Sequence, residues 1–185
     1  DLAVWDWQGR RQQTPIWQLW GLDGPRQVAT SVTLGLGSVE QVLARLERWW
    51  SQLPAHRIKL KLGSPDGLDH DGQLLTAVAA ALEQRQQTQG QSMELQVDAN
   101  GGWSVDQTRQ MLPALEQQGV VLLEQPVAAQ HDPDLDLAGF AALHGDCPMP
   151  LVADESCWGL EDLLRLAPHV DGVNLKLLKT GGLSE

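Results

Sequence analysis

Short apolar segments alternate with amphipathic segments along most of this chain, and this alternation restricts its fold more than any other feature. Strand-like segments occupy residues 32–37, 57–63, 94–100, 120–126, 150–156 and 172–179. Helix-like segments between them occupy residues 39–50, 74–82, 104–118, 135–144 and 159–167. A strand–helix unit repeated in this way predicts a parallel sheet covered by helices. Periodicity alone leaves open whether that sheet is doubly wound or closed into a barrel.

Two of the predicted helices carry signals for their first residues. Ser38 with Gln41, and Ser104 with Gln107, have the spacing of a capping box, in which side chains satisfy free N–H groups at a helix start. The apolar residues after Ser38 form one helical stripe: Val39, Val42, Leu43, Leu46, Trp49 and Trp50. Pro113 is expected to bend the helix that begins after Ser104.

Polar residues lie at or near the C-terminal end of one predicted strand after another. In chain order they are Lys59, Lys61, Asp98, Asn100, Glu124, Asp154, Glu155 and Lys176. A (β/α)₈ barrel builds its active site at this end of its strands. We therefore predict an α/β protein that forms part of a TIM (β/α)₈ barrel, with about six βα units present.

Three acidic residues come from three consecutive predicted strands and suggest a metal site. Because adjacent parallel strands lie about 4.8 Å apart, Asp98, Glu124 and Asp154 can meet around one cation. Oxygen donors without His or Cys suit Mg²⁺, with water and substrate at the remaining positions. Glu155 points away from its neighbour Asp154, so only one of the two can enter the barrel mouth. Without a cation, the converging carboxylates should have raised pKa values.

Three lysines near this acidic trio are candidates for acid/base catalysis. Lys59 and Lys61 are two residues apart and therefore share a face, so the charge of Lys59 should lower the pKa of Lys61 and let it act as a base. Lys176 lies on the sixth predicted strand, across the mouth, and could return a proton to the opposite face of a carbon. A Lys-x-Lys pair by itself usually lies at a solvated strand edge. The prediction of an active site therefore rests on the two lysines together with the acidic trio and Lys176.

Composition narrows the possible partners and compartment. The net charge of −11 and the pI of about 4.7 argue against binding to nucleic acid or to an anionic membrane. We find no apolar segment of about 18 residues and no signal-peptide pattern, so we expect a cytoplasmic protein. Cys147 and Cys157 belong to no metal-binding pattern and are expected to be free thiols.

Five motifs resemble the enolase superfamily, in its muconate-lactonizing enzyme subgroup. They are KLKLG (59–63), VDANGGW (97–103), LLEQP (122–126), VADES (152–156) and NLKLLKTGG (174–182). The resemblance implies Mg²⁺ bound by Asp98, Glu124 and Asp154, with Asn100 as a polar companion of the metal shell. It also implies abstraction of a proton alpha to a carboxylate, through an enediolate stabilised by the metal.

The same resemblance implies roles for the lysines and a class of substrate. Lys61 and Lys176 are implied as the two acid/base catalysts and Lys59 as the residue that tunes Lys61, whereas the role of Lys179 is open. The motifs are most similar to those of dipeptide epimerases, which invert one α-carbon of a dipeptide such as L-Ala-L-Glu by a two-lysine 1,1-proton transfer. The alternatives are o-succinylbenzoate synthase and muconate cycloisomerase on the same scaffold. Members of the subgroup commonly form homo-oligomers.

Both ends of the chain resemble interior parts of a longer fold. Residues 1–30 are expected to be a lead-in helix, with Leu2, Ala3, Trp5 and Trp7 on its apolar side, and a linker from a capping domain. Residues 31–185 are expected to be the barrel domain, truncated before its last two strands. Six of eight strands would leave two open edges, so we expect the 185 residues alone to be inactive or poorly folded. A non-catalytic fragment is the remaining alternative.

Overall fold

The computed structural model describes residues 1–24 and 28–184 and forms two compact units. The smaller unit combines Asp1–Ala29 with Leu175–Glu185, and the larger unit is Thr30–Asn174. Residues 25–27 of the predicted linker, and Glu185 at the end of the predicted barrel domain, lie outside the described residues.

The larger unit contains one sheet of six parallel strands that follow one another in chain order. The strands are β1 Val32–Leu34, β2 Arg57–Lys61, β3 Glu94–Asp98, β4 Val120–Glu124, β5 Leu151–Ala153 and β6 Gly172–Val173. The helices between them are α3 Val39–Gln52, α4 Leu68–Gln89, α5 Val105–Gln117, α6 Pro133–His144 and α7 Leu160–Leu166. No helix within the described residues is long and apolar enough to cross a membrane.

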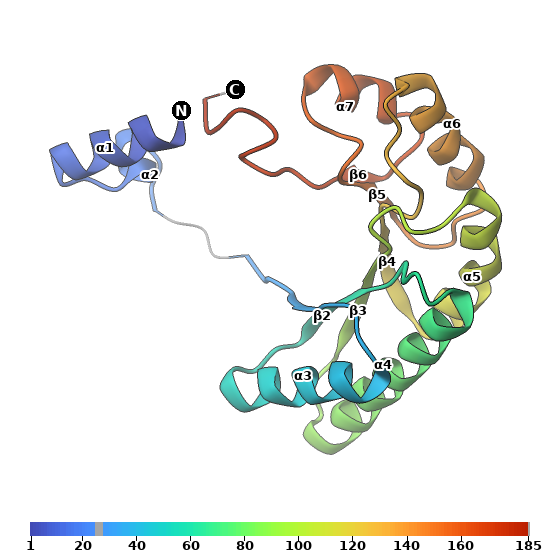
Figure 1. Ribbon diagram of the computed structural model, residues 1–185. Helices are drawn as coiled ribbons and strands as arrows, with labels where there is room; N and C mark the ends of the chain where they lie inside the picture. The colour runs from blue at the N-terminus through green and yellow to red at the C-terminus, as the bar shows by residue number, and fades with distance from the viewer. Residues whose placement is uncertain (25–27, 185) are drawn as a thin grey trace. The chain divides into compact units, whose positions relative to one another are not determined.

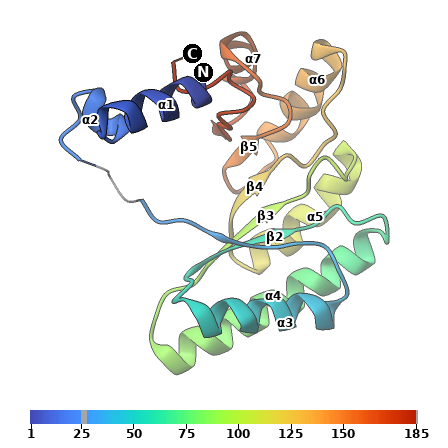
Figure 2. The ribbon, with the colours of Figure 1, turned by 60° about the vertical axis from the view of Figure 1, so that its left-hand side comes forward.

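The position of the helices decides between the two architectures. All five helices of the larger unit lie on the same side of its sheet (Figures 1 and 2). A doubly wound sheet has helices on both faces and changes strand order at a switch point, whereas this sheet does neither. The larger unit is therefore a six-stranded part of a (β/α) barrel, as predicted.

The two predicted capping boxes are present. The Ser38 hydroxyl accepts from the backbone N–H of Gln41 at 3.3 Å, and the Gln41 side chain accepts from the N–H of Ser38 at 3.1 Å. Ser104 and Gln107 make the same reciprocal pair at 3.1 and 2.8 Å. These bonds satisfy N–H groups that a helix start leaves without a partner. The helices that follow β1 and β3 therefore begin where the sequence indicates.

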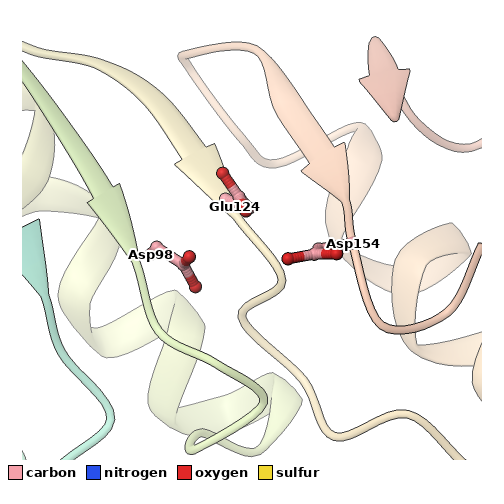
Figure 3. A group of neighbouring side chains, drawn as sticks. All are labelled: Asp98, Glu124 and Asp154. Atoms are coloured by element: carbon pink, nitrogen blue, oxygen red, sulfur yellow. The ribbon is translucent and has the colours of Figure 1, made fainter. Parts of the chain in front are cut away.

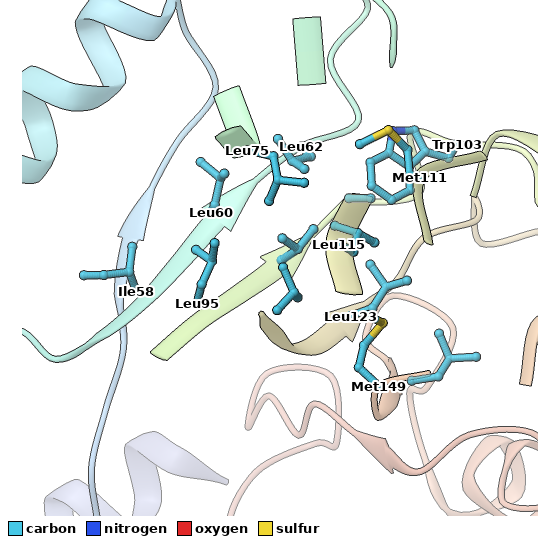
Figure 4. Packing of buried hydrophobic residues seen from close by; sticks show 14 of the residues in the cluster. Ile58, Leu60, Leu62, Leu75, Leu95, Trp103, Met111, Leu115, Leu123 and Met149 are labelled. Atoms are coloured by element: carbon cyan, nitrogen blue, oxygen red, sulfur yellow. The ribbon is translucent and has the colours of Figure 1, made fainter. Parts of the chain in front are cut away.

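The main core lies between the sheet and its helices. Ile58, Leu60 and Leu62 are fully buried on this side, where they pack with Leu75 of α4 and Leu115 of α5 (Figure 4). Successive strand side chains point to opposite faces, so an apolar residue at every second position of β2 fixes which face meets the helices. The intervening residues of β2, which are lysines, therefore project from the other face.

All six strands are shorter than the predicted segments, and the difference is largest for β6. The segment 172–179 was expected to be a strand, but β6 contains only Gly172–Val173, and Lys176 lies beyond it. The N–H of Asn174 makes the final bond to its neighbour strand, at 2.7 Å from the Ala153 oxygen. Because β5 ends at Ala153, which pairs with Val173, the residues after Val173 have no strand partner in β5.

The smaller unit begins with the helix that the sequence predicts. Its two helices are α1 Leu2–Gln12 and α2 Ile16–Leu19. Leu2 and Trp5 are partly buried, whereas Ala3 and Trp7, also expected on the apolar side, are exposed. The rings of Trp5 and Trp20 pack edge to face, with their centroids 5.2 Å apart, and join the two helices.

Candidate active site and metal centre

Three buried carboxylates converge at the C-terminal ends of β3, β4 and β5. Asp98, Glu124 and Asp154 are 1%, 3% and 1% exposed. Each offers an oxygen atom, and these atoms lie within 4.8 Å of one another. Figure 3 shows the three side chains pointing toward a common centre. The structure thus brings together the trio that the sequence predicts.

Strand register explains how the trio forms. Lys61 pairs with Asp98 across β2 and β3, and Asp98 pairs with Glu124 across β3 and β4. Glu124 in turn pairs with Val152 of β5, so Asp154 lies two residues beyond that row. The three residues therefore do not lie in one row across the sheet. Asp154 still reaches the other two because residues two apart share a face of the strand.

Both lysines of β2 contact the carboxylates. Lys59 Nζ donates to Glu124 and lies 3.8 Å from Asp98 Oδ2. Lys61 Nζ donates to Asp98 Oδ2 at 2.5 Å. The prediction that the two side chains share a face is confirmed. Two ammonium groups thus offset part of the charge of three carboxylates.

Burial controls the ionisation of Glu124. Loss of water around this carboxyl is the largest effect and raises its pKa above 4.5, and the nearby charge of Asp98 raises it further. Hydrogen bonds from Lys59 and Asn174 oppose the rise without reversing it. A raised pKa was predicted for carboxylates that converge without a cation, and for Glu124 this prediction is confirmed.

Asn174 belongs to the site although the sequence analysis assigned it no role. Its Nδ2 donates to Glu124 Oε1 at 2.9 Å and lies 3.3 Å from Asp154 Oδ2. A signal was present, because Asn174 directly follows β6 and is two residues before the predicted catalyst Lys176. The amide bridges two carboxylates and so fixes their separation.

Asn100 and Glu155 lie at the edge of the trio. The backbone N–H of Asn100, a residue with φ of 47°, donates to Asp98 Oδ1 at 2.9 Å. The Asn100 side chain lies 3.5 Å from Glu155 Oε1. Of the neighbours Asp154 and Glu155, Asp154 joins the trio, as strand alternation predicts. The contact of Asn100 with Asp98 thus comes from its backbone.

Lys176 lies in the smaller unit, in a turn after β6. Its carbonyl oxygen accepts from the N–H of Lys179 at 2.8 Å and from that of Thr180 at 3.1 Å. Its expected role as the second catalytic lysine stays a prediction.

The chemistry of the site fits a hard divalent cation. The three candidate ligands are carboxylates, and oxygen ligands are those that Mg²⁺ prefers. Three carboxylates against two lysines leave a local excess of negative charge, which a cation would neutralise. Asp98, Glu124 and Asp154 are therefore the residues that could hold Mg²⁺.

Proteins of known activity are similar to this chain along its whole length. The hydrophobic dipeptide epimerase of Flavobacteria bacterium (strain MS024-2A) is 37% identical over 185 residues, which cover 100% of this chain and 50% of that protein. The L-Ala-D/L-Glu epimerase of Escherichia coli (strain K12) is 34% identical and is covered to 51% of its length.

A solved structure gives the same result in three dimensions. The dipeptide epimerase from Enterococcus faecalis V583, complexed with Mg and the dipeptide L-Leu-L-Tyr, has a TM-score of 0.77 to this chain at 30% identity. The match covers 98% of this chain and 48% of that structure. The chain spans about half the length of each of these three relatives.

A family model matches most of the chain. The model for enolase C-terminal domain-like proteins matches residues 41–185. This range includes the three predicted metal ligands and the three lysines predicted to take part in catalysis. Because this match covers most of the chain and the fold is a six-stranded part of a barrel, the chain belongs to the enolase C-terminal domain-like family.

Proposed function

We propose that the protein is a Mg²⁺-dependent dipeptide epimerase. The observation that carries the proposal is the buried trio Asp98, Glu124 and Asp154 with Lys59 and Lys61 in direct contact with it. Relatives that match the whole chain are named as dipeptide epimerases, which supports the choice of reaction.

The trio would hold the metal, and Asn174 would keep two of its members apart. When bound, Mg²⁺ would supply positive charge that stabilises a substrate carboxylate as negative charge develops next to it. Burial of the three ligands keeps competing water away and strengthens that effect, because electrostatic interactions are stronger where water is excluded.

Proton transfer is assigned to the two lysines. Lys61, in its deprotonated form, would take the proton from the α-carbon, and the electron pair of the broken C–H bond would move into the neighbouring carboxylate. The ammonium of Lys176 then gives a proton to the opposite face of the same carbon, which inverts its configuration. One proton leaves and one arrives, and the two lysines exchange roles in the reverse direction. Lys59 binds Glu124 and would place a positive charge beside Lys61, which favours the neutral form of Lys61.

The substrate class is proposed to be a dipeptide. The two relatives named above differ in the dipeptide that their names specify, since one is hydrophobic and the other is L-Ala-D/L-Glu. L-Ala-L-Glu and a hydrophobic dipeptide such as L-Leu-L-Tyr are therefore both substrates to test. Cytoplasmic localisation and a homo-oligomeric state stay predictions from the sequence.

The proposal is tested by isotope exchange in the full-length gene product. With dipeptides in D₂O, we expect deuterium at one α-carbon, observed by NMR. Lys61→Ala and Lys176→Ala should each reduce epimerisation by roughly 10²- to 10⁴-fold, the usual contribution of an acid/base group. Mg²⁺ binding should remain, and Lys179→Ala serves as the control from the same turn as Lys176.

Three outcomes would point elsewhere. Full epimerisation by both lysine variants would refute the two-lysine mechanism. Turnover of a succinylbenzoate precursor, with no exchange in any dipeptide, would assign the same site to elimination or ring closure. No Mg²⁺ binding in a calorimetric titration would leave the non-catalytic alternative.

A further inference from the structure

Gln125 has an uncommon backbone conformation directly beside the trio. It follows Glu124 in the chain, is fully buried, and has a φ of 36°. Residues other than glycine rarely adopt this left-handed region, because it brings the side chain close to the backbone. The surroundings must therefore hold Gln125 in this conformation.

The side-chain amide of Gln125 uses its full hydrogen-bonding capacity. Its Oε1 accepts from the backbone N–H of Asp154 at 2.8 Å and from that of Ser156 at 3.3 Å. Its Nε2 donates to the Val127 carbonyl and to the Ser156 hydroxyl, both at 2.8 Å. Two accepted and two donated bonds are all that an amide can make. The amide thus connects the segment after β4 to the segment after β5.

Ser156 and Asp136 fix the orientation of that amide. The Ser156 hydroxyl accepts from Gln125, so its single proton is available to Asp136 Oδ1, at 2.8 Å. Asp136 lies on α6 and is 8% exposed, and burial raises the pKa of its carboxyl although the bond from Ser156 opposes the rise. The hydroxyl cannot donate in both directions, so the Gln125 nitrogen must face Ser156 and its oxygen must face Asp154.

Asp154 depends on this contact because it lies just past the end of its strand. The pairing of β5 ends at Ala153, and the N–H of Asp154 donates to the Gln125 side chain instead of to a neighbouring strand. The residue that directly follows Glu124 therefore holds the backbone of Asp154. Two candidate metal ligands from different strands are connected through one side chain.

We propose that Gln125 is a positioning residue that sets Asp154 relative to Glu124 for Mg²⁺ binding, and that Ser156 and Asp136 hold its amide in the required orientation. This inference rests on the proposed Mg²⁺ site. It adds three buried residues that are not among the candidate metal ligands but determine how well those ligands are prearranged.

The test measures Mg²⁺ affinity and metal-free stability separately. Gln125→Met keeps the side-chain length but removes all four bonds, and should weaken Mg²⁺ binding by roughly 10- to 100-fold in calorimetric titration. Ser156→Ala should weaken it less, and Ser156→Thr, which keeps the hydroxyl, should restore native affinity. Titrations are made below the metal-free unfolding temperature of each variant, with folding checked by circular dichroism.

Thr108→Val is the matched control. Thr108 is also fully buried and its hydroxyl donates to the Ser104 carbonyl at 2.8 Å, within α5. This variant should lose stability without losing Mg²⁺ affinity. If the loss of any buried hydrogen bond weakened Mg²⁺ binding, Thr108→Val would lose affinity as Ser156→Ala does.

Native affinity in Gln125→Met would overturn the inference and leave the metal site intact. Affinity losses that follow the fall in unfolding temperature in all variants, Thr108→Val included, would show a structural role only. If Gln125→Met does not fold, the contrast between Ser156→Ala and Ser156→Thr decides. Absence of Mg²⁺ binding in the unsubstituted protein would overturn the proposed site and this inference together.

Discussion

Glu124 shows at the scale of one residue how burial prepares a metal ligand. A carboxyl that is 3% exposed loses most of its hydration, and this loss raises its pKa despite hydrogen bonds from Lys59 and Asn174. A cation would provide the stabilisation that water no longer gives. Protons and Mg²⁺ therefore compete for the same carboxyl oxygens.

This competition predicts a pH dependence of Mg²⁺ binding. Because the pKa of Glu124 is raised above 4.5 in the metal-free protein, protons compete at higher pH than for an ordinary glutamate. Mg²⁺ affinity should be constant at high pH and fall as the pH decreases through the raised pKa, by up to about tenfold per pH unit for each proton displaced.

Calorimetric titration at several pH values measures this dependence. Glu94→Gln is the control, since Glu94 pairs with Arg57 and its pKa is lowered. Affinity that stays constant down to pH 4.5 would contradict the raised pKa of Glu124.

The elements around the site are joined by a buried carboxylate on α4. Asp71 is fully buried and accepts from the backbone N–H groups of Gly63 and Ser64, at 3.0 and 3.2 Å, and from the Trp103 indole at 2.8 Å. It thus ties the loop after β2 to the loop after β3. The loops lie so close that a Cβ on Gly63, whose φ is 78°, would be 2.1 Å from the Ala99 oxygen.

Removal of Asp71 should therefore destabilise the barrel strongly. Asp71→Ala would leave three N–H groups without this acceptor, those of the partly buried Gly63 and Ser64 and of the buried Trp103 indole, at a cost of up to about 1–3 kcal/mol each. We expect a loss of at least about 3 kcal/mol in the free energy of unfolding, measured by urea denaturation. The dependence of this free energy on urea concentration should be the same as in the unsubstituted protein. Asp69→Ala in the same first turn of α4 is the control, because Asp69 is exposed and should cost less than about 1 kcal/mol. Equal losses in the two variants would contradict this role.

At the scale of the whole molecule, the sheet has two outer strands. Within the described residues β1 pairs with β2 and β6 pairs with β5, and no strand closes the sheet. On α7, Leu160 and Leu164 are 69% and 67% exposed. Open strand edges and exposed apolar residues favour association with other chains.

The 185-residue chain produced alone should therefore be aggregation-prone or poorly folded, and inactive. Sedimentation velocity and near-UV circular dichroism measure the first two properties, and dipeptide epimerisation measures the third. The full-length gene product is the comparison. An isolated chain that is monomeric, unfolds cooperatively and turns over substrate would contradict the expectation.

Local patterns were sufficient for most of the fold and for the acidic trio. The period of two in β2 places Lys59 and Lys61 on one face, and Ser38 and Ser104 mark helix starts through side chains only three residues away. Such patterns depend on neighbours in sequence, so they can be read without the structure. Strand length was less predictable, because β6 ends where its neighbour strand ends.

The contacts among strand ends could be found only in the tertiary structure. Asn174 bridges Glu124 and Asp154, and Gln125 binds the backbone of Asp154, through residues that are 20 to 50 positions apart in the chain. No periodic pattern encodes these pairs, because they arise from strand register and from the paths of the loops. The sequence by itself determined the alternation of strands and helices and the polar groups at the strand ends. The tertiary structure decided which of those groups meet, because hydrogen bonds between distant segments depend on how the whole sheet packs.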